Sequence, residues 1–352
     1  MTLPGYKFLY VIPFFTIIIL LLSCGPGKEQ PEMLELSGIT MGTTYNIKVK
    51  SRIPENIQDG IRIDVAGILE NLDNRMSTYI PESELTQINR NNITSRQIIS
   101  DDLYRVIAEA LYVSRLTDGA FDITIGPLVN LWGFGPMEKD IAIPPNEAIK
   151  AELVKTGFKN LDLQPESRSL LKKIPGLYID LSGIAKGYAV DKVAEYLDNS
   201  GYTDYMVEIG GEIRAAGLNA SQQPWNIGIE KPVPGIRSVQ RAVPLRNMAM
   251  ATSGDYRNFF EIDGIRYSHT IDPRTGTPVH HNLISVTVLN PSASIADALA
   301  TGLLVLGPVA ADKVAQEHNI AAYFMVRNGE GFEESVTPAF KTYLDGGSMQ
   351  DP

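Results

Sequence analysis

The chain has 352 residues, of which 44% are hydrophobic, so it contains enough apolar material for a sizeable folded core. Its formal net charge of −10 lacks the excess of Lys and Arg that would neutralise a phosphate backbone, so we expect no nucleic-acid partner. Cys24 is the single cysteine, so no disulfide can form within the chain.

The first residues are typical of an export signal. Residues 1–23 carry one charged side chain, Lys7, followed by an apolar run over 8–22 with small residues at its end. The Leu-Leu-Ser-Cys sequence that ends at Cys24 resembles a bacterial lipobox, which implies a lipoprotein signal peptide over 1–23 and lipidation of Cys24. An uncleaved membrane helix is the alternative, although the apolar run is short for a span. Residues 24–35 then form a tether, and the protein is expected on the periplasmic side of a bacterial cell membrane, held by its lipid anchor.

Hydrophobic periodicity predicts helices and strands that do not alternate regularly. Helices are predicted at 61–76, 101–116, 147–156, 184–199, 294–306 and 309–317. Strands are predicted at 45–50, 177–181, 205–209, 225–229, 248–252, 258–262, 284–289 and 321–326. This order indicates an α+β fold with mixed sheets and flanking helices rather than a doubly wound sheet. No stretch is typical of a linker, so we expect one globular unit.

One stretch combines an apolar run, a tight turn and a helix. We predict a strand over 177–181, a turn at Ser182 and Gly183, and a helix directly after it. Unpaired N–H groups and the positive dipole end at a helix N-terminus favour anions, so a phosphate-bearing ligand suits this turn. A plainer explanation is that Ser182 caps the helix, while Gly183 and Gly187 serve packing.

Residues 180–191, Asp-Leu-Ser-Gly-Ile-Ala-Lys-Gly-Tyr-Ala-Val-Asp, resemble the signature of the ApbE family, the bacterial FAD:protein FMN transferases. Further matches recur from Met41 to about Gly307, so the resemblance covers most of the chain. It implies an ApbE-like domain over 36–345 and an Mg²⁺-dependent enzyme that moves FMN from FAD to a threonine or serine hydroxyl, with release of AMP. The acceptor is then a flavin-accepting membrane or extracytoplasmic redox protein.

The resemblance also implies which residues contact FAD. They are Met41, Tyr79, Ala120, Phe121, Asp122, Asp180, Lys186 and Ile271. The Tyr79 ring can stack on the isoalloxazine, Asp122 can accept hydrogen bonds from ribose or adenine, and Lys186 can balance pyrophosphate charge. Each local pattern also has an ordinary explanation, such as a strand start at Met41 or a helix C-cap before Ala120.

Asp297 and Thr301 are four residues apart on a predicted helix, so their side-chain oxygens share one face. The resemblance adds the position of Gly183 to this metal site, and a glycine can contribute only its backbone carbonyl. A carboxylate, a hydroxyl, a carbonyl and diphosphate oxygens suit Mg²⁺, which is a hard ion. Taken alone, Asp297 and Thr301 are more simply explained as a solvated or capping pair.

His269 lies in the matching stretch 268–276, where turn chemistry at Asp272 and Pro273 explains much of the sequence but not the histidine. Neutral imidazole can accept a proton from a hydroxyl near pH 7, so the resemblance implies that His269 is the general base. A structural role in bracing the turn is the alternative. Glu212 lies in another matching stretch and is assigned no role.

The sequence leaves two other functions open. One is hydrolysis of FAD to FMN and AMP in the same site, with water as the nucleophile. The other is a non-catalytic FAD-binding lipoprotein that stores or delivers FAD. The joint presence of His269 and the metal ligands argues against storage, which would need neither.

Overall fold

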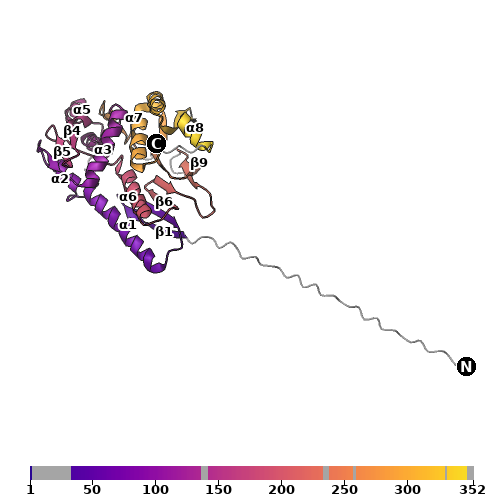
Figure 1. Ribbon diagram of the computed structural model, residues 1–352. Helices are drawn as coiled ribbons and strands as arrows, with labels where there is room; N and C mark the ends of the chain where they lie inside the picture. The colour runs from indigo at the N-terminus through magenta and orange to yellow at the C-terminus, as the bar shows by residue number, and fades with distance from the viewer. Residues whose placement is uncertain (2–32, 136–141, 233–237, 257–258, 330, 347–352) are drawn as a thin grey trace. The chain divides into compact units, whose positions relative to one another are not determined.

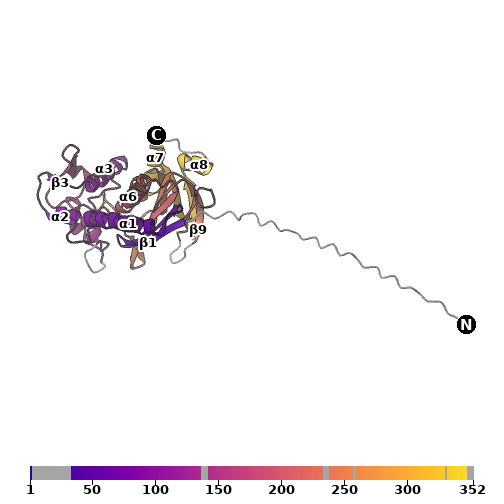
Figure 2. The same ribbon diagram turned by 60° about the horizontal axis from the view of Figure 1, so that its bottom comes forward.

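The computed structural model describes Met1 and residues 33–135, 142–232, 238–256, 259–329 and 331–346. The described residues from Met33 onward form one compact unit, which is coloured in Figures 1 and 2. Cys24, the predicted signal peptide apart from Met1, and most of the predicted tether lie outside the described residues. Lipidation and export therefore stay predictions.

An eight-stranded antiparallel sheet forms the centre of this unit. In spatial order its strands are β1 (Met33–Thr40), β2 (Thr43–Lys50), β6 (Tyr205–Ile209), β7 (Glu212–Ala216), β10 (Met248–Gly254), β15 (Leu283–Asn290), β16 (Ala321–Asn328) and β17 (Gly331–Val336). On β10, Ala249 and Ala251 face one hydrophobic core, whereas Met248 and Met250 face another. Because side chains alternate across a strand, the first half of β10 is buried on both faces, and residues 248–251 form a continuous apolar run.

Helices cover both faces of the sheet (Figure 1). On one face, α6 (Ala185–Asn199) and α7 (Ala293–Glu317) pack against the strands and each other, while α1 (Glu55–Met76) and α3 (Asp101–Leu116) pack outside them. The other face carries α8 (Pro338–Leu344) and the hairpin of β8 (Trp225–Glu230) and β9 (Val239–Leu245). The shorter helices are α2 (Glu84–Arg90), α4 (Gly126–Leu131), α5 (Asn146–Leu153) and the 3-10 helix η1 (Phe158–Asn160).

Smaller antiparallel sheets complete the unit. One contains β3 (Gln97–Ile98), β4 (Leu161–Gln164) and β5 (Ser169–Lys172). Two others are the pair β11 (Phe259–Ile262) and β12 (Ile265–Ser268), and the pair β13 (Ile271–Asp272) and β14 (Thr277–Pro278). His269 lies between β12 and β13, so the ends of these two pairs fix its position.

α7 is interrupted at Gly307, where φ is 75° and ψ is 170°, directly before Pro308. The sequence predicted two helices, over 294–306 and 309–317, and this break is confirmed. In the described part of the chain, α7 is the one helix that is long and apolar enough to cross a membrane. Because 67% of its most apolar window is buried inside the unit, its hydropathy is that of a core helix.

The α+β prediction is confirmed, and α3 and β6 have the predicted bounds. Other predicted elements differ from the observed ones mostly at their ends; α1, for example, begins at Glu55 rather than at 61. The predicted tether extends too far, because β1 begins at Met33 and Leu34 is buried in the main core. An alternating burial pattern along β1 shows that this segment belongs to the sheet.

The strand predicted over 177–181 is wrong. This segment buries Leu177 and Ile179 completely, but it belongs to no sheet. The Asn89 side chain donates to the carbonyl of Ile179 and accepts from its N–H, both at 2.8 Å. A side chain thus replaces the neighbouring strand as hydrogen-bond partner, and a hydrophobic pattern cannot distinguish the two.

Candidate active site

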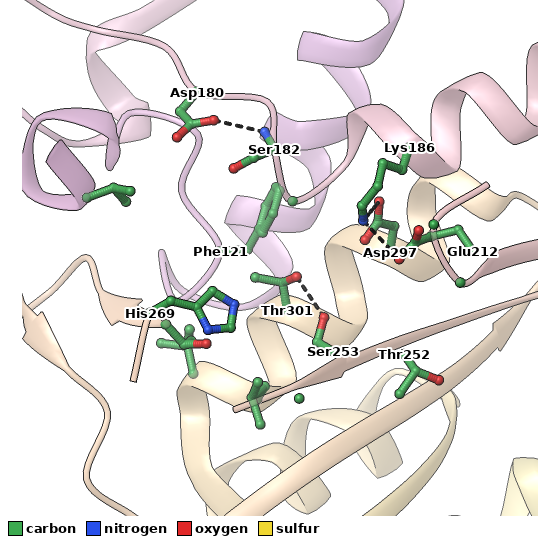
Figure 3. A pocket seen from close by; sticks show the side chains of 18 of the residues that line it. Phe121, Asp180, Ser182, Lys186, Glu212, Thr252, Ser253, His269, Asp297 and Thr301 are labelled. Carbon is green, nitrogen blue, oxygen red and sulfur yellow. Dashed lines mark hydrogen bonds and ion pairs between the residues drawn. The ribbon is translucent and has the colours of Figure 1, made fainter. Parts of the chain in front are cut away.

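A cavity of about 630 Å³ opens where segments far apart in the chain meet. Its walls come from the loop after α3, the turn before α6, the β6–β7 hairpin, the end of β10, the segment between β12 and β13, and α7. Figure 3 shows how side chains from these segments surround the cavity. Most of the predicted site residues line it, namely Tyr79, Ala120, Phe121, Asp122, Asp180, Gly183, Lys186, His269, Ile271, Asp297 and Thr301.

The turn before α6 is held by Asp180. Its carboxylate accepts a hydrogen bond from the N–H of Ser182 at 2.9 Å, and burial raises the pKa of this carboxyl. α6 begins at Ala185 without a side-chain cap, so the alternative that Ser182 caps the helix is wrong. The N–H groups of Ala185 and Gly187 donate to the preceding turn and to Asp297. Few donors at this helix end are therefore available to a phosphate.

Two glycines allow the turn to pack closely. A Cβ on Gly187 would lie 2.3 Å from the carbonyl oxygen of Ala293, so any side chain would force α6 and α7 apart. A Cβ on Gly183 would lie 3.1 Å from the Phe121 ring and 3.6 Å from the Thr301 hydroxyl oxygen. The packing explanation is confirmed for both glycines, and it also brings the Gly183 backbone close to Thr301.

Lys186 lies between two buried carboxylates, Glu212 on β7 and Asp297 on α7 (Figure 3). Its Nζ is 2.9 Å from Oε1 of Glu212 and 3.9 Å from Oδ2 of Asp297. Oδ2 of Asp297 also accepts the N–H of Gly187 at 3.1 Å, whereas Oε2 of Glu212 is buried without a hydrogen-bond partner. The ammonium of Lys186 therefore pairs closely with Glu212 and lies farther from Asp297.

Burial is the main influence on the ionisation of this cluster. It raises the pKa of Glu212 to about 8, with Lys186 opposing the rise and Asp297 adding to it. Burial also raises the pKa of Asp297, and Lys186 again opposes it. For Lys186 burial lowers the pKa, but the two carboxylates more than offset this and hold the pKa above its usual value.

Oxygen atoms gather beside this cluster. Thr301 lies one helical turn after Asp297 on α7, and its hydroxyl is 2.9 Å from that of Ser253 at the end of β10. Within the described residues, no group of three or more His, Cys, Asp or Glu side chains could hold a metal ion. A metal here would depend on Asp297, Thr301, the Gly183 carbonyl and oxygens of a ligand, which is a donor set for a hard cation.

His269 enters the cavity from the segment between β12 and β13, and its ring faces the cavity in Figure 3. The edge of the ring meets Phe134, with 6.3 Å between ring centroids. Phe134 stacks on Phe260, which stacks on Tyr267, each pair with centroids 5.2 Å apart. This aromatic column supports the half-buried imidazole, so His269 is braced on one side and faces the cavity on the other.

Residues 41–324 match the sequence model of the ApbE family. This chain belongs to the ApbE family. Its ApbE relatives include the FAD:protein FMN transferase of Vibrio cholerae serotype O1, which is 46% identical over 319 residues, covering 90% of this chain and 95% of the relative. The FAD:protein FMN transferase of Escherichia coli K12 is 38% identical over 329 residues, covering 91% of this chain and 92% of the relative.

Solved ApbE structures have the same fold. The flavin transferase ApbE from Vibrio cholerae superposes with a TM-score of 0.82 at 44% identity, covering 89% of this chain and 99% of that one. The apo form of the Pseudomonas stutzeri flavinyl transferase ApbE gives a TM-score of 0.83 at 39% identity, with 92% and 99% covered. These values confirm the expected ApbE fold for this chain.

Asp122 lines the ApbE cavity, but its carboxylate already has partners. Oδ1 accepts the N–H and hydroxyl of Thr124 at 2.8 and 2.7 Å, and Oδ2 accepts the N–H of Phe158 at 2.7 Å. Asp122 is therefore a brace that ties its own loop to the residues before β4. Three hydrogen bonds thus use most of the roughly four acceptor positions of this carboxylate. Its contact with ribose or adenine stays a prediction.

Met41 and Tyr79 differ in their positions. Met41 forms the two-residue turn between β1 and β2 with Gly42, and both have positive φ, 48° and 71°, as in a type I′ hairpin turn. Its side chain packs partly buried against the main core and does not line the cavity. Tyr79 lies at the rim with 69% of its surface exposed, so its ring is accessible for stacking.

Among the residues that line the cavity, Glu212 and Ser253 bond to predicted site residues but had no role predicted from the sequence. Glu212 follows a two-residue glycine turn, in which Ile209 and Glu212 are paired across the hairpin. A Gly-Gly pair between two apolar strands indicates such a hairpin and could have placed Glu212 at its end. No sequence signal links Ser253 to Thr301, because their contact depends on how α7 packs against β10.

Proposed function

We propose that this ApbE family member transfers FMN from FAD to a serine or threonine hydroxyl of an acceptor protein and releases AMP. The observation that carries this proposal is one cavity lined by His269, Lys186, Asp297 and Thr301, in a chain whose relatives are named FAD:protein FMN transferases. A protein that only stored FAD would need neither a base nor a cation site beside it.

In the proposed reaction the acceptor oxygen bonds to the phosphorus on the FMN side of the diphosphate. The bond between this phosphorus and the bridging oxygen breaks, and AMP leaves with that oxygen. His269 accepts the proton of the attacking hydroxyl, as a general base within reach of the cavity. Lys186 places a positive charge beside the diphosphate, where it stabilises charge that develops on the leaving group.

The proposed metal is Mg²⁺. Asp297, Thr301 and the carbonyl of Gly183 would hold it, and its remaining positions would be filled by water and diphosphate oxygens. When bound, Mg²⁺ stabilises negative charge on the phosphoryl oxygens. In support, Thr301 and Asp297 both line the cavity, and Asp297 is a buried carboxylate that, among the described residues, accepts one hydrogen bond, from the N–H of Gly187.

We further propose that Cys24 carries a lipid anchor and that the acceptor is a membrane or extracytoplasmic redox protein on the periplasmic side of a bacterial cell membrane. The export-like residues 1–23 and the lipobox-like sequence at Cys24 support this. Cys24→Ser should leave an uncut precursor without lipid, because the chain has no other thiol. Mass spectrometry of the membrane fraction tests this, and an acylated variant cut before residue 24 would disprove it.

The transfer itself is tested by incubating the protein with FAD, Mg²⁺ and a candidate flavin-accepting protein, followed by mass spectrometry of the acceptor. The expected result is one covalently added FMN, with AMP released in equal amount. The matched control is the acceptor with its modified serine or threonine replaced by alanine, which should stay unmodified. AMP and free FMN without a modified acceptor would indicate hydrolysis instead, and the absence of any product would leave only binding.

A further inference from the structure

Glu212 has no part in the proposed reaction, yet it lines the cavity and is only 3% exposed. It begins β7 directly after the glycine turn, with Oε1 at 2.9 Å from Nζ of Lys186. Its second oxygen is buried without a hydrogen-bond partner. Burying a carboxylate costs free energy unless it is paired, so the position of Glu212 points to a purpose for its ion pair with Lys186.

Lys186 has a second anion within reach. Oδ2 of Asp297 is 3.9 Å from the ammonium nitrogen, which is beyond hydrogen-bond distance but close enough for a change of side-chain rotamer to bring them together. A lysine bonded directly to Asp297 would occupy an oxygen that a metal ion needs. Its positive charge would also repel the ion at short range.

The net charge of the cluster also links Glu212 to cation binding. When all three groups are ionised, Glu212, Lys186 and Asp297 together carry one negative charge, which attracts a divalent cation. Without Glu212 the remaining pair is neutral. The short contact on the Glu212 side and the long contact on the Asp297 side show which carboxylate holds the lysine.

We propose that Glu212 is a positioning residue for the cation site: it holds the ammonium of Lys186 away from Asp297, so that Asp297 stays available to a divalent cation. This inference rests on the proposed Mg²⁺ site at Asp297. It assigns the two carboxylates different tasks, since Glu212 binds the lysine and Asp297 binds the metal.

The test measures Mg²⁺ affinity by isothermal titration calorimetry on the full-length protein in mild detergent, without FAD, at pH 8.5. Glu212→Ala should weaken Mg²⁺ binding by roughly tenfold or more. A neighbouring charge within hydrogen-bond range changes the proton affinity of a carboxylate by about one to three powers of ten, and attraction of a metal cation depends on the same electrostatics. The decisive variant is Glu212→Ala combined with Lys186→Met. It removes the lysine as well, restores one net negative charge and should return the affinity to near the wild-type value.

Glu208→Gln is the matched control. Glu208 lies on the same hairpin, lines the same cavity and loses the same charge, but its carboxylate bonds to Asn46 and the N–H of Gly211 rather than to Lys186. This variant should change Mg²⁺ affinity far less than Glu212→Ala. An equal loss in both would show that net charge alone matters, and would overturn the positioning role.

The remaining outcomes separate this inference from the metal site itself. Absence of Mg²⁺ binding in the wild type would overturn the site at Asp297. Wild-type binding together with an unchanged Glu212→Ala variant, or a folded double variant that fails to recover, would overturn the role of Glu212. Melting temperatures check folding, and Glu212→Gln with and without Lys186→Met replaces the alanine pair if that pair does not fold.

Discussion

Two buried aspartates on different walls of the cavity have opposite surroundings. Asp122, 6% exposed, accepts three hydrogen bonds, two from Thr124 and one from the N–H of Phe158. Asp297, 3% exposed, accepts one hydrogen bond, from Gly187, and faces Lys186 across 3.9 Å. Residue type and burial are nearly the same, so the main difference between the two carboxylates lies in their hydrogen-bond and ion-pair partners.

This difference in partners distinguishes a carboxylate that stabilises the wall of the cavity from one that can bind a ligand. A buried carboxylate whose oxygens accept hydrogen bonds from its own chain ties those segments together and has little capacity left for another partner. A buried carboxylate with one donor and a nearby cation keeps an oxygen for a metal ion. Residue type and pocket lining therefore do not identify function without an account of the hydrogen bonds.

The largest effect on turnover is expected at His269. Like Asp297, and unlike Asp122, it is proposed to act on the reacting groups. His269→Ala should reduce FMN transfer by about 10²- to 10⁴-fold, the usual contribution of a positioned general base. FAD affinity should persist, since Lys186 and Tyr79 remain. Initial rate, FAD affinity and melting temperature measured on one preparation decide the matter. A parallel fall of all three would instead favour bracing of the turn at Asp272.

Asp297→Asn should come next. Loss of the anionic ligand should lower FMN transfer by about 10- to 100-fold at limiting Mg²⁺, as for other changes at metal sites, with partial recovery at high Mg²⁺. The melting temperature should change little, because the amide oxygen can still accept the N–H of Gly187. Rates across an Mg²⁺ titration provide the measurement, and unchanged activity at limiting Mg²⁺ would refute the assignment.

Asp122→Asn should lower stability more than turnover, the reverse of Asp297→Asn. The new amide NH₂ would face an N–H donor of Thr124 or Phe158, and one unsatisfied buried group costs about 1–3 kcal/mol of unfolding free energy. Turnover at saturating FAD should stay within a few-fold of wild type. Urea unfolding and initial rates on both asparagine variants test the contrast directly. If Asp122→Asn lost FAD binding while keeping its stability, Asp122 would be a ligand contact after all.

The last prediction concerns the pH dependence of folding stability at the cluster around Lys186, where we expect the smallest effect. Burial raises the pKa of Glu212 from its ordinary value of 4.5 to about 8. A carboxyl with a higher pKa in the folded state favours folding below pH 4.5, and this contribution is lost as pH rises to about 8. Without Mg²⁺, the melting temperature of the wild type relative to Glu212→Gln should fall across this window and then level off. A constant difference would contradict the raised pKa.

The sequence by itself determined the local elements and the residue types of the site. α3 and β6 have their predicted bounds because helical and strand periodicity are local properties of the chain. The break at Gly307 was predictable for the same reason, since a glycine followed by a proline ends a helix locally. The resemblance to the ApbE family, carried by several stretches of the sequence, likewise pointed to His269 and Asp297, both of which line the cavity.

Only the tertiary structure decided which groups are partners. The segment 177–181 was mistaken for a strand because its partner is the side chain of Asn89, distant in sequence. Asp122 matched the expected pattern, but two backbone N–H groups and the Thr124 hydroxyl already bond to its oxygens. Glu212 had no assigned role until the fold placed it beside Lys186. Hydrogen bonds and ion pairs depend on distances of a few ångströms between segments that meet only on folding, and no local pattern encodes those distances.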